Sequence, residues 1–283
     1  LRLVTPLQKI PQNVQVITSR ALDDQQVTSL AEGVIRNVSG ATKLEHWSSY
    51  TRINMRRARA SEFRNGMNVT SDWGPLSADM SIVDRIEFVK GPAGFMMSNG
   101  DPSGIFNIVT KKPTGVTGGE ASLMFGSFDL YRATLDVDGH FDKSRRLLYR
   151  LDVMGQTENS FQANRFNNRY TLHPVITYKL DRNTDLTAEY TLQYDRMSDM
   201  GTPYVFSPKG YADLPRNFTT LGAGVAPATI RDQTLFLYLD HKFNEHWKLS
   251  VHGAYLHSSQ IGSDAWPSSL DSAGNMIRSI SIG

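Results

Sequence analysis

Two features of this 283-residue chain could in principle do chemistry: a glycine-rich segment and scattered histidines. The segment Gly91–Gly104 could fold its backbone around a phosphate. It contains neither G-x-x-x-x-G-K-[ST] nor G-x-G-x-x-G, and a strand pattern rather than a helix follows it. We interpret it as backbone turning. Since no nucleophile–base arrangement occurs elsewhere, the sequence predicts that the protein is not an enzyme.

The histidines favour no metal centre. Glu45 and His46 are neighbours on a polar stretch, where they could not both reach one ion without help. His246, His252 and His257 lack a fixed set of partner ligands, and the chain contains no cysteine. We therefore expect no direct protein–metal bond, no disulfide and no thiolate site.

Composition excludes further classes. The chain has 30 basic and 28 acidic residues, so it lacks the clustered basic excess of a nucleic-acid-binding protein. It has no stretch of about 18 apolar residues for a transmembrane helix, whereas a spanning β-strand needs only about 9–11 alternating residues. The opening residues are not a secretory signal, and the chain stops inside an alternating run. We expect both ends to be internal to a longer gene product.

The first 114 residues show a mixed α/β pattern. A helix is predicted from Ser19 or Ala21 to Val34, where apolar residues recur at helical spacing. The polar stretch Asn37–Tyr50 reads as a loop. The predicted strands are Val14–Ile17, Ile82–Lys90 and Ile105–Thr110.

From about Gly119 the pattern changes to long strands with a period of two. The clearest is Leu186–Asp195, with Leu, Ala and Tyr on one face and Thr, Glu, Gln and Asp on the other. An eighth strand begins near Asn275. The other predicted strands are Glu120–Phe128, Tyr131–Asp138, Leu147–Gln156, Tyr170–Leu180, Thr234–Phe243 and Trp247–His257.

The connections between these strands alternate in length. Tight turns are predicted at Asp142–Arg146, Asp181–Asn183 and Asn244–His246, with one further short link near Ser127 and Phe128. Short turns at one rim and long loops at the other are typical of an outer-membrane barrel, although a soluble β-sandwich also gives alternating strands. The predicted long loops are Glu158–Arg169, Met197–Ile230 and Ser258–Gly274.

The number of residues in the first half indicates how wide the predicted barrel must be. Backbone groups in hydrocarbon must all be paired, so a spanning sheet closes on itself. Seven or eight strands enclose only side chains, whereas plugged lumens belong to barrels of about 22 strands. We therefore predict a mixed α/β plug domain at 1–116. The first seven to eight antiparallel transmembrane strands of a larger β-barrel follow at 117–283.

The plug resembles a known family. Asp84–Pro113, DRIEFVKGPAGFMMSNGDPSGIFNIVTKKP, is similar to the strand, turn, glycine loop and exit strand of TonB-dependent outer-membrane receptors, in particular the ferric-siderophore branch. Thr5–Leu22, Gly126–Phe141 and Tyr149–Phe161 extend the resemblance over nearly the whole chain. Within Ile53–Ala58 only Arg56 matches the family's Ile-Arg-Gly-Phe strand, which puts the shape of the following loop in question. The TonB coupling box is expected upstream.

This resemblance implies uptake of a ferric siderophore across the Gram-negative outer membrane. The expected partners are the siderophore, the inner-membrane protein TonB and outer-membrane lipid. Iron would arrive chelated, so no cofactor is expected. The alternatives are import of another bulky nutrient, such as a glycan or cobalamin, and a signalling receptor that does not transport.

The resemblance also assigns roles to single residues. Arg56 and Lys90 match positions where plug cations pair with barrel glutamates as a plug–barrel latch; the alternative is solvated surface charge. Ligand contact is expected from six residues on outward plug loops, although packing of their loops against the wall is the alternative for each. These residues are His46, Trp47, Tyr50, Arg59, Phe63 and Trp73.

The alternation assigns two faces to the strands. Polar residues of the predicted barrel would face a wet lumen and the plug, and aromatic residues would face lipid. The lumen-side residues include Arg132, Asp136, Arg150, Asp152 and Glu189. The lipid-side residues include Tyr131, Tyr149, Tyr190, Tyr194, Trp247 and Tyr255.

Overall fold

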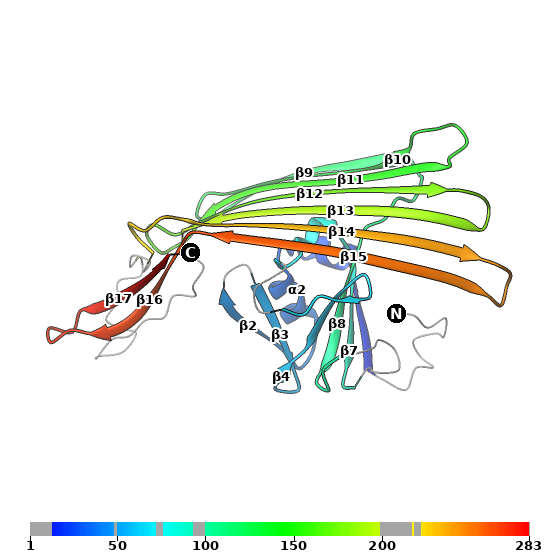
Figure 1. The fold of residues 1–283 in the computed structure, drawn as a ribbon. Helices are drawn as coiled ribbons and strands as arrows, with labels where there is room; N and C mark the ends of the chain where they lie inside the picture. Colours follow the sequence, from blue (N-terminus) through cyan, green and yellow to red (C-terminus); the bar gives the residue numbers. More distant parts are fainter. Residues whose placement is uncertain are drawn as a thin grey trace.

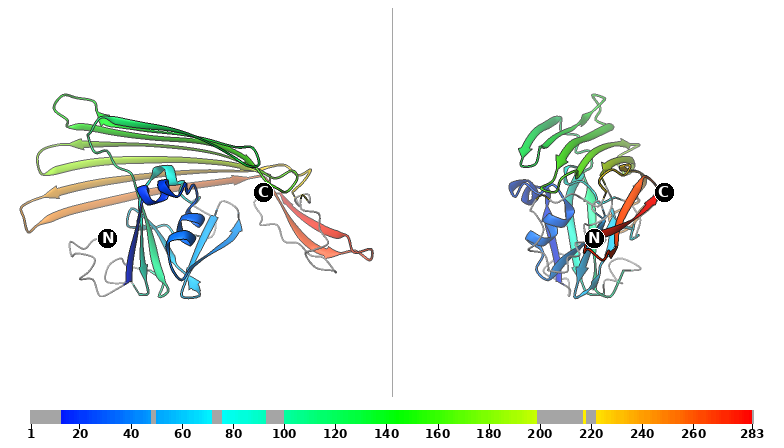
Figure 2. Two further views of the ribbon diagram at one scale, coloured as in Figure 1. Left: turned by 180° about the vertical axis from the view of Figure 1, so that it is seen from behind. Right: turned by 90° about the vertical axis from the view of Figure 1, so that its left-hand side faces the viewer.

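The computed structural model describes residues 13–47, 50–71, 76–92, 100–198, 217 and 222–282. They form a long seven-stranded antiparallel sheet and a smaller α/β body (Figure 1). Viewed along its strands, the long sheet is an open arc with the α/β body on its concave side (Figure 2). We call the sheet β9–β15 the wall and the body built from β1–β8 the plug. The predicted fold class is confirmed.

The plug holds two sheets and two helices. Its five-stranded sheet has the order β1-β7-β8-β5-β6, in which β5 runs parallel to β8. The strands are β1 (Asn13–Thr18), β5 (Ser61–Arg64), β6 (Met67–Asn68), β7 (Val83–Lys90) and β8 (Gly104–Thr110), and a short 3₁₀ turn η2 (Met80–Ile82) precedes β7. The second sheet comprises β2 (Ala41–Trp47), β3 (Tyr50–Met55) and β4 (Ala58–Arg59). The helices are α1 (Ser19–Asp24) and α2 (Leu30–Asn37).

An apolar core holds these elements together. Phe88 of β7 and Phe106 of β8 stack with ring centroids 6.0 Å apart, and both are essentially inaccessible to solvent. Ile53, Ile82 and Val34 bring the second sheet, η2 and α2 into the same cluster. Each buried side chain of this size contributes roughly 1.5–3 kcal/mol to folding. The plug is therefore an ordinary globular domain with its apolar residues inside.

Two sequence-based predictions for the plug were wrong. The single helix over Ser19–Val34 is two helices, because Gln26 adopts a left-handed φ of 53° and Ser29 starts a second helix by accepting a bond from the amide of Glu32. The predicted loop Asn37–Tyr50 contains β2, which pairs with β3. Four of the seven residues of β2 are polar, which is why the sequence pattern predicted a loop.

The wall strands run in chain order across the sheet, each antiparallel to the next. The predicted strands are confirmed, and most are longer than their clearest alternating run. They are β9 (Gly118–Gly126), β10 (Leu130–His140), β11 (Leu147–Asn159), β12 (Phe166–Lys179), β13 (Thr184–Met197), β14 (Ala228–Lys242) and β15 (Lys248–Ile261). β10–β15 each have 11 to 15 residues, enough for a tilted strand to cross a bilayer.

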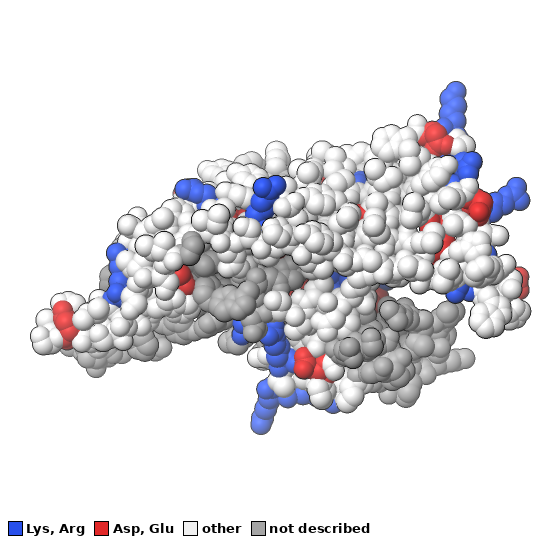
Figure 3. Space-filling view, in the orientation of Figure 1, with Lys and Arg blue, Asp and Glu red and all other residues white. Residues whose placement is uncertain are grey.

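The two faces of the wall have opposite character, as predicted. Most buried residues on the concave face are polar, among them Asp152, His173 and Glu189, with apolar exceptions such as Val175 and Phe236. Those on the convex face are apolar and exposed, among them Tyr131 and Leu237. Figure 3 shows this convex face as a largely uncharged surface, with charged groups gathered towards the rims. Among the described residues, no helix is both long enough and apolar enough to cross a membrane.

The connections follow the predicted alternation with two corrections. Short turns join β10 to β11, β12 to β13 and β14 to β15 at one rim, as expected. At the other rim, the predicted long loop Glu158–Arg169 is only 160–165, because β11 and β12 extend to Asn159 and Phe166. The predicted loop Ser258–Gly274 is mostly strand. After Gly262, with φ of 143°, β16 (Ser263–Leu270) pairs with β17 (Met276–Ile282) as a separate hairpin.

Candidate functional site

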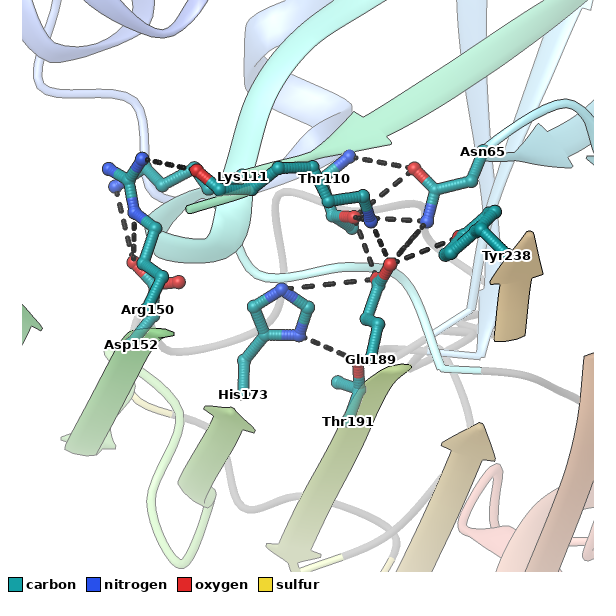
Figure 4. A network of polar contacts seen from close by, with 10 residues as sticks. Asn65, Thr110, Lys111, Arg150, Asp152, His173, Glu189, Thr191 and Tyr238 are labelled. Atoms are coloured by element: carbon teal, nitrogen blue, oxygen red, sulfur yellow. Dashed lines mark hydrogen bonds and ion pairs between the residues drawn. The ribbon is translucent and has the colours of Figure 1, made fainter. Parts of the chain in front are cut away.

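The plug and the wall meet through polar side chains, and the largest group of contacts converges on Glu189 of β13 (Figure 4). Its carboxylate, wholly buried, accepts bonds from the Thr110 hydroxyl at 2.7 Å and the Asn65 amide at 3.1 Å. The Tyr238 hydroxyl donates to it at 3.0 Å, and the Lys112 ammonium forms an ion pair with it. One wall carboxylate thus binds two separate segments of the plug.

The backbone conformation of the plug directs the Asn65 and Thr110 side chains towards the wall. Asn65 lies in the β5–β6 turn with φ of 50°, a conformation that asparagine tolerates well, and Gly66 follows at φ 82°. Thr110 ends β8, and its amide donates to the Asn65 side-chain oxygen at 3.0 Å. The turn and the end of β8 are therefore bonded to each other as well as to Glu189.

His173 of β12 completes the pocket around Glu189. Its Nδ1 lies 2.8 Å from the Thr191 hydroxyl, and its Nε2 lies 3.9 Å from a Glu189 carboxylate oxygen. The ring is inaccessible to solvent. Lys112 also lies over the Tyr238 ring, with its ammonium 4.8 Å from the centroid. The wall thus supplies a preformed polar socket for the segment that leaves the plug.

A second group of contacts lies one residue earlier in the chain. The Lys111 ammonium is 2.8 Å from Asp136 of β10 and 3.6 Å from Asp152 of β11. Arg150 donates two bonds to Asp136, at 2.6 and 3.0 Å, and one to the Lys112 carbonyl at 3.2 Å. Arg150 also lies 3.9 Å from Asp138, so two cations here face three carboxylates.

A third contact joins η2 to the wall. Arg132 of β10 donates to both carboxylate oxygens of Asp79, at 2.9 and 2.6 Å, and to Gln156 at 2.8 Å. Burial alone would raise the pKa of Asp79, but the charge and hydrogen bonds of Arg132 outweigh it and hold this pKa below its usual range. A two-pronged arginine–carboxylate pair is among the stronger polar contacts in proteins.

Towards the long-loop rim the contact becomes partly apolar. Tyr50 and Leu76 of the plug pack with Met197, Ala228 and Ile230 of the wall. The Gln260 side chain donates to the Tyr50 hydroxyl, the Gln193 side chain donates to the Ser77 carbonyl at 3.0 Å, and the Leu76 amide bonds to Asp232.

The six predicted ligand contacts differ in how exposed their side chains are in the structure. Tyr50 and Phe63 are 7% and 2% exposed, so their rings pack inside the protein, which corrects their assignment as side chains open to a ligand. Arg59 lies in β4 and donates to the Ser71 carbonyl at 2.7 Å. His46 and Trp47 end β2. The positions of their side chains and all of Trp73 lie outside the described residues.

The predicted latch residues lie together in the plug. The Arg56 guanidinium packs on Gly91, 2.8 Å from where a Cβ would stand, and the Lys90 ammonium donates to the Ser39 carbonyl at 2.7 Å. The β3–β4 turn, which carries Arg56, lies on the side of the plug turned away from the wall (Figure 1).

The sequence predicted the wall residues of the plug–wall contact but not the plug residues that meet them. It marked Arg132, Asp136, Arg150, Asp152 and Glu189 as lumen-facing, and the structure brings all five to the interface. It missed the plug partners Asp79, Lys111 and Lys112, and the wall residue His173. The two lysines stand in the matched exit motif, which was the available signal. Among the described residues, no group of three or more His, Asp or Glu is placed to hold a metal ion.

Comparison with known proteins agrees with this architecture. The family model described as TonB-dependent Receptor Plug Domain matches residues 6–105. The metal-pseudopaline receptor CntO of Pseudomonas aeruginosa is 31% identical over 287 residues, covering 98% of this chain and 39% of the relative. The ferrioxamine B receptor of Salmonella typhimurium is 26% identical, covering 94% and 40%. The chain thus spans about two fifths of the length of these curated relatives.

Solved structures share the fold. The ferripyoverdine receptor of the outer membrane of Pseudomonas aeruginosa, bound to ferripyoverdine, superimposes with a TM-score of 0.82 at 24% identity, covering 94% of this chain and 37% of that one. The closed form of the ferric-catecholate import receptor Fiu from Escherichia coli gives 0.84 at 19% identity, covering 97% and 42%. At less than 25% identity, these two structures show a shared fold.

Proposed function

Because this chain belongs to the TonB-dependent receptors of the bacterial outer membrane, we propose that its protein imports a ferric siderophore, with TonB supplying the force that moves the plug. The supporting observation is the polar contact between plug and wall. Its hydrogen-bonding groups can be rehydrated when they separate, whereas an apolar core would lose its burial energy outright. A contact of this kind can hold the lumen shut and still be opened.

The ligand would bind on the outer side of the plug. Next to the β2–β3 tip and the segment after β6, Tyr50 and Leu76 pack against Met197 and Ile230 near the long-loop rim of the wall. Arg59 of β4 donates to the Ser71 carbonyl. His46, Trp47, Arg59 and Trp73 remain our proposed ligand contacts. Aromatic rings can grip the organic shell of a siderophore, and cations attract its anionic chelating groups. Iron would stay in its chelator, so the protein needs no cofactor or metal ligand of its own.

Arg56 and Lys90 are proposed to fasten the plug to a part of the barrel other than this wall. The β3–β4 turn points away from β9–β15, so any carboxylates that face it would belong to further strands. The wall described here would then hold one side of the plug and those strands the other.

The experiment is uptake of radioactive iron by cells carrying the complete gene that encodes this chain. Each candidate ferric siderophore is offered to cells with the gene, to cells with the gene deleted, and to cells with the gene but no TonB. We expect accumulation only when gene, TonB and proton gradient are all present. Binding at the cell surface with no accumulation would instead identify a signalling receptor.

A second candidate cargo is a chelate of another metal, because the 31% identical relative is a metal-pseudopaline receptor. Parallel assays with radioactive zinc and iron, each with and without chelator, separate the two cargoes. Uptake of labelled cobalamin or a glycan in place of either metal would replace both proposals.

A further inference from the structure

The convex face of the wall carries two arginines at the outer end of its strands. Arg196 lies near the end of β13 and Arg231 near the start of β14, and both side chains are exposed. Arg196 pairs with Thr229, and Tyr194 pairs with Arg231. Arg196 and Arg231 are thus diagonal neighbours on one face, where Cα atoms stand about 7–8 Å apart.

These arginines mark the edge of an apolar band. Tyr170 pairs with Tyr194 in the same row as Arg231, and further rows of the convex face are rich in Leu, Ile and Tyr as far as Tyr178. The eight residue steps from Tyr170 to Tyr178 span about 27 Å, or about 21 Å along the membrane normal for a tilt near 40°. That height is close to the apolar band of about 25 Å expected of an outer-membrane wall. Because the short turns lie at the opposite rim, the arginines face the outer leaflet.

Within the described part of the chain, neither arginine has a carboxylate partner. The Arg196 guanidinium lies 5.4 Å from the centroid of the Phe166 ring, and the register places Asn168, Thr229 and Ser259 on the same face, with no acid among them. Two cations at the inner rim, by contrast, already have partners. Lys248 pairs with Asp240 at 2.8 Å, and Arg146 donates to the Lys179 carbonyl at 3.1 Å.

We propose that Arg196 and Arg231 bind the phosphate of a lipid headgroup, specifically a phosphorylated glycolipid of the outer leaflet. The forked guanidinium matches phosphate oxygens better than any other side chain. Tyr170 and Tyr194 lie in the row of Arg231 and one row inward from Arg196, at the level where tyrosines anchor a protein to the membrane interface. The lipid would brace the wall beside the loop that leaves β13. This site is independent of which nutrient the receptor carries.

The test uses the complete receptor, purified in detergent, with bisphosphorylated lipid A as the probe. Arg196→Gln and Arg231→Gln should each weaken binding about fivefold, and the double variant about thirtyfold. Lys248→Gln, which removes an exposed cation at the inner rim, is the matched control and should bind as wild type. The same lipid stripped of its phosphates should bind the wild type and all four variants weakly and equally.

Wild-type affinity in the double variant would overturn the proposal, as would an equal loss for the lipid without phosphates. Full competition by millimolar inorganic phosphate would point to an anion site that does not require lipid, and would also overturn it. A measurement on the unmodified receptor guards against misfolding of the variants. Lipid A should protect Arg196 and Arg231 from an arginine-modifying reagent, and unchanged labelling of both residues would sink the idea.

Discussion

The plug and the wall bury opposite kinds of side chain. In the plug, Ile86, Phe88 and Ile108 fill the interior, as in a protein dissolved in water. In the wall, the face turned inwards carries Asp152 and Glu189, while leucines and tyrosines point outwards. One chain thus follows two rules of burial, separated by the few residues between Thr110 and Gly118.

This difference in buried residues reflects the different solvent that surrounds each region. The plug sits in a wet lumen, so its stability comes from hiding apolar surface. The outer face of the wall meets hydrocarbon, so its apolar residues need no cover, and its strands are held by a backbone ladder that runs from β9 to β15. Where the regions meet, both offer polar surface. Their contact therefore depends on a few charged groups. Four substitutions test the comparison of plug and wall, in decreasing order of expected effect.

The largest effect should come from the plug core. Phe106→Ala in the complete receptor is expected to lower the free energy of unfolding of the plug by about 4 kcal/mol, because it leaves a cavity beside Phe88. Hydrogen exchange of the plug amides measures this loss, and heat-dependent gel mobility reports the barrel. Phe125→Ala, on the exposed face of β9, is the control. If both substitutions loosened the plug equally, the two rules of burial would not be separate.

The next effect tests the outer face of the wall. Leu235 lies about midway along the apolar band, so Leu235→Arg should destabilise the barrel in lipid by about 3 kcal/mol. Leu249→Arg, near the inner rim, should cost only about 0–1 kcal/mol because its charge can reach water. Unfolding by denaturant in vesicles compares the two. Equal losses at both positions would mean that this face does not line a membrane.

The contact between the regions comes third. Glu189→Gln keeps the shape of the side chain but leaves Lys112 without its counter-charge, so plug–wall association should weaken by about 2 kcal/mol. Protease cleavage of the plug in the assembled receptor measures the change. Asp185→Asn, on the same strand but exposed at the rim, should have no effect. Unaltered cleavage in the Glu189 variant would show that the plug is held elsewhere.

The smallest effect concerns pH. Burial raises the pKa of Glu62 in β5 to about 7, from a usual 4.5, although Arg64 and Arg59 partly oppose the shift. The folded plug therefore keeps this proton where the unfolded chain has lost it, and plug stability should fall as pH rises from about 4.5 to 7. Glu62→Gln should abolish that slope. Denaturant midpoints at pH 5 and pH 8 decide the matter, and an unchanged slope in the variant would contradict it.

Local patterns allowed much of this fold to be predicted. Side chains on any strand alternate between its two faces. The alternation of polar and apolar residues therefore predicted the wall strands, and it placed Glu189 and Tyr190 on opposite faces. The same reasoning failed where local signals were weak. Gln26 breaks the predicted helix although glutamine is a fair helix former, and the strands β2 and β16 consist largely of residues that read as loop.

The candidate site shows most clearly which features depend on local sequence and which depend on the tertiary structure. The sequence by itself determined that Asp136 and Glu189 would face inwards, because that depends only on strand parity. It could not determine that Lys111 would meet the first and Lys112 the second, 25 and 77 residues away. The sequence also could not show that the rings of Tyr50 and Phe63 are buried, so we predicted both as ligand contacts. Whether an aromatic ring on a loop is open to a ligand or covered by the wall depends on how two domains pack, and that is settled only when the chain has folded.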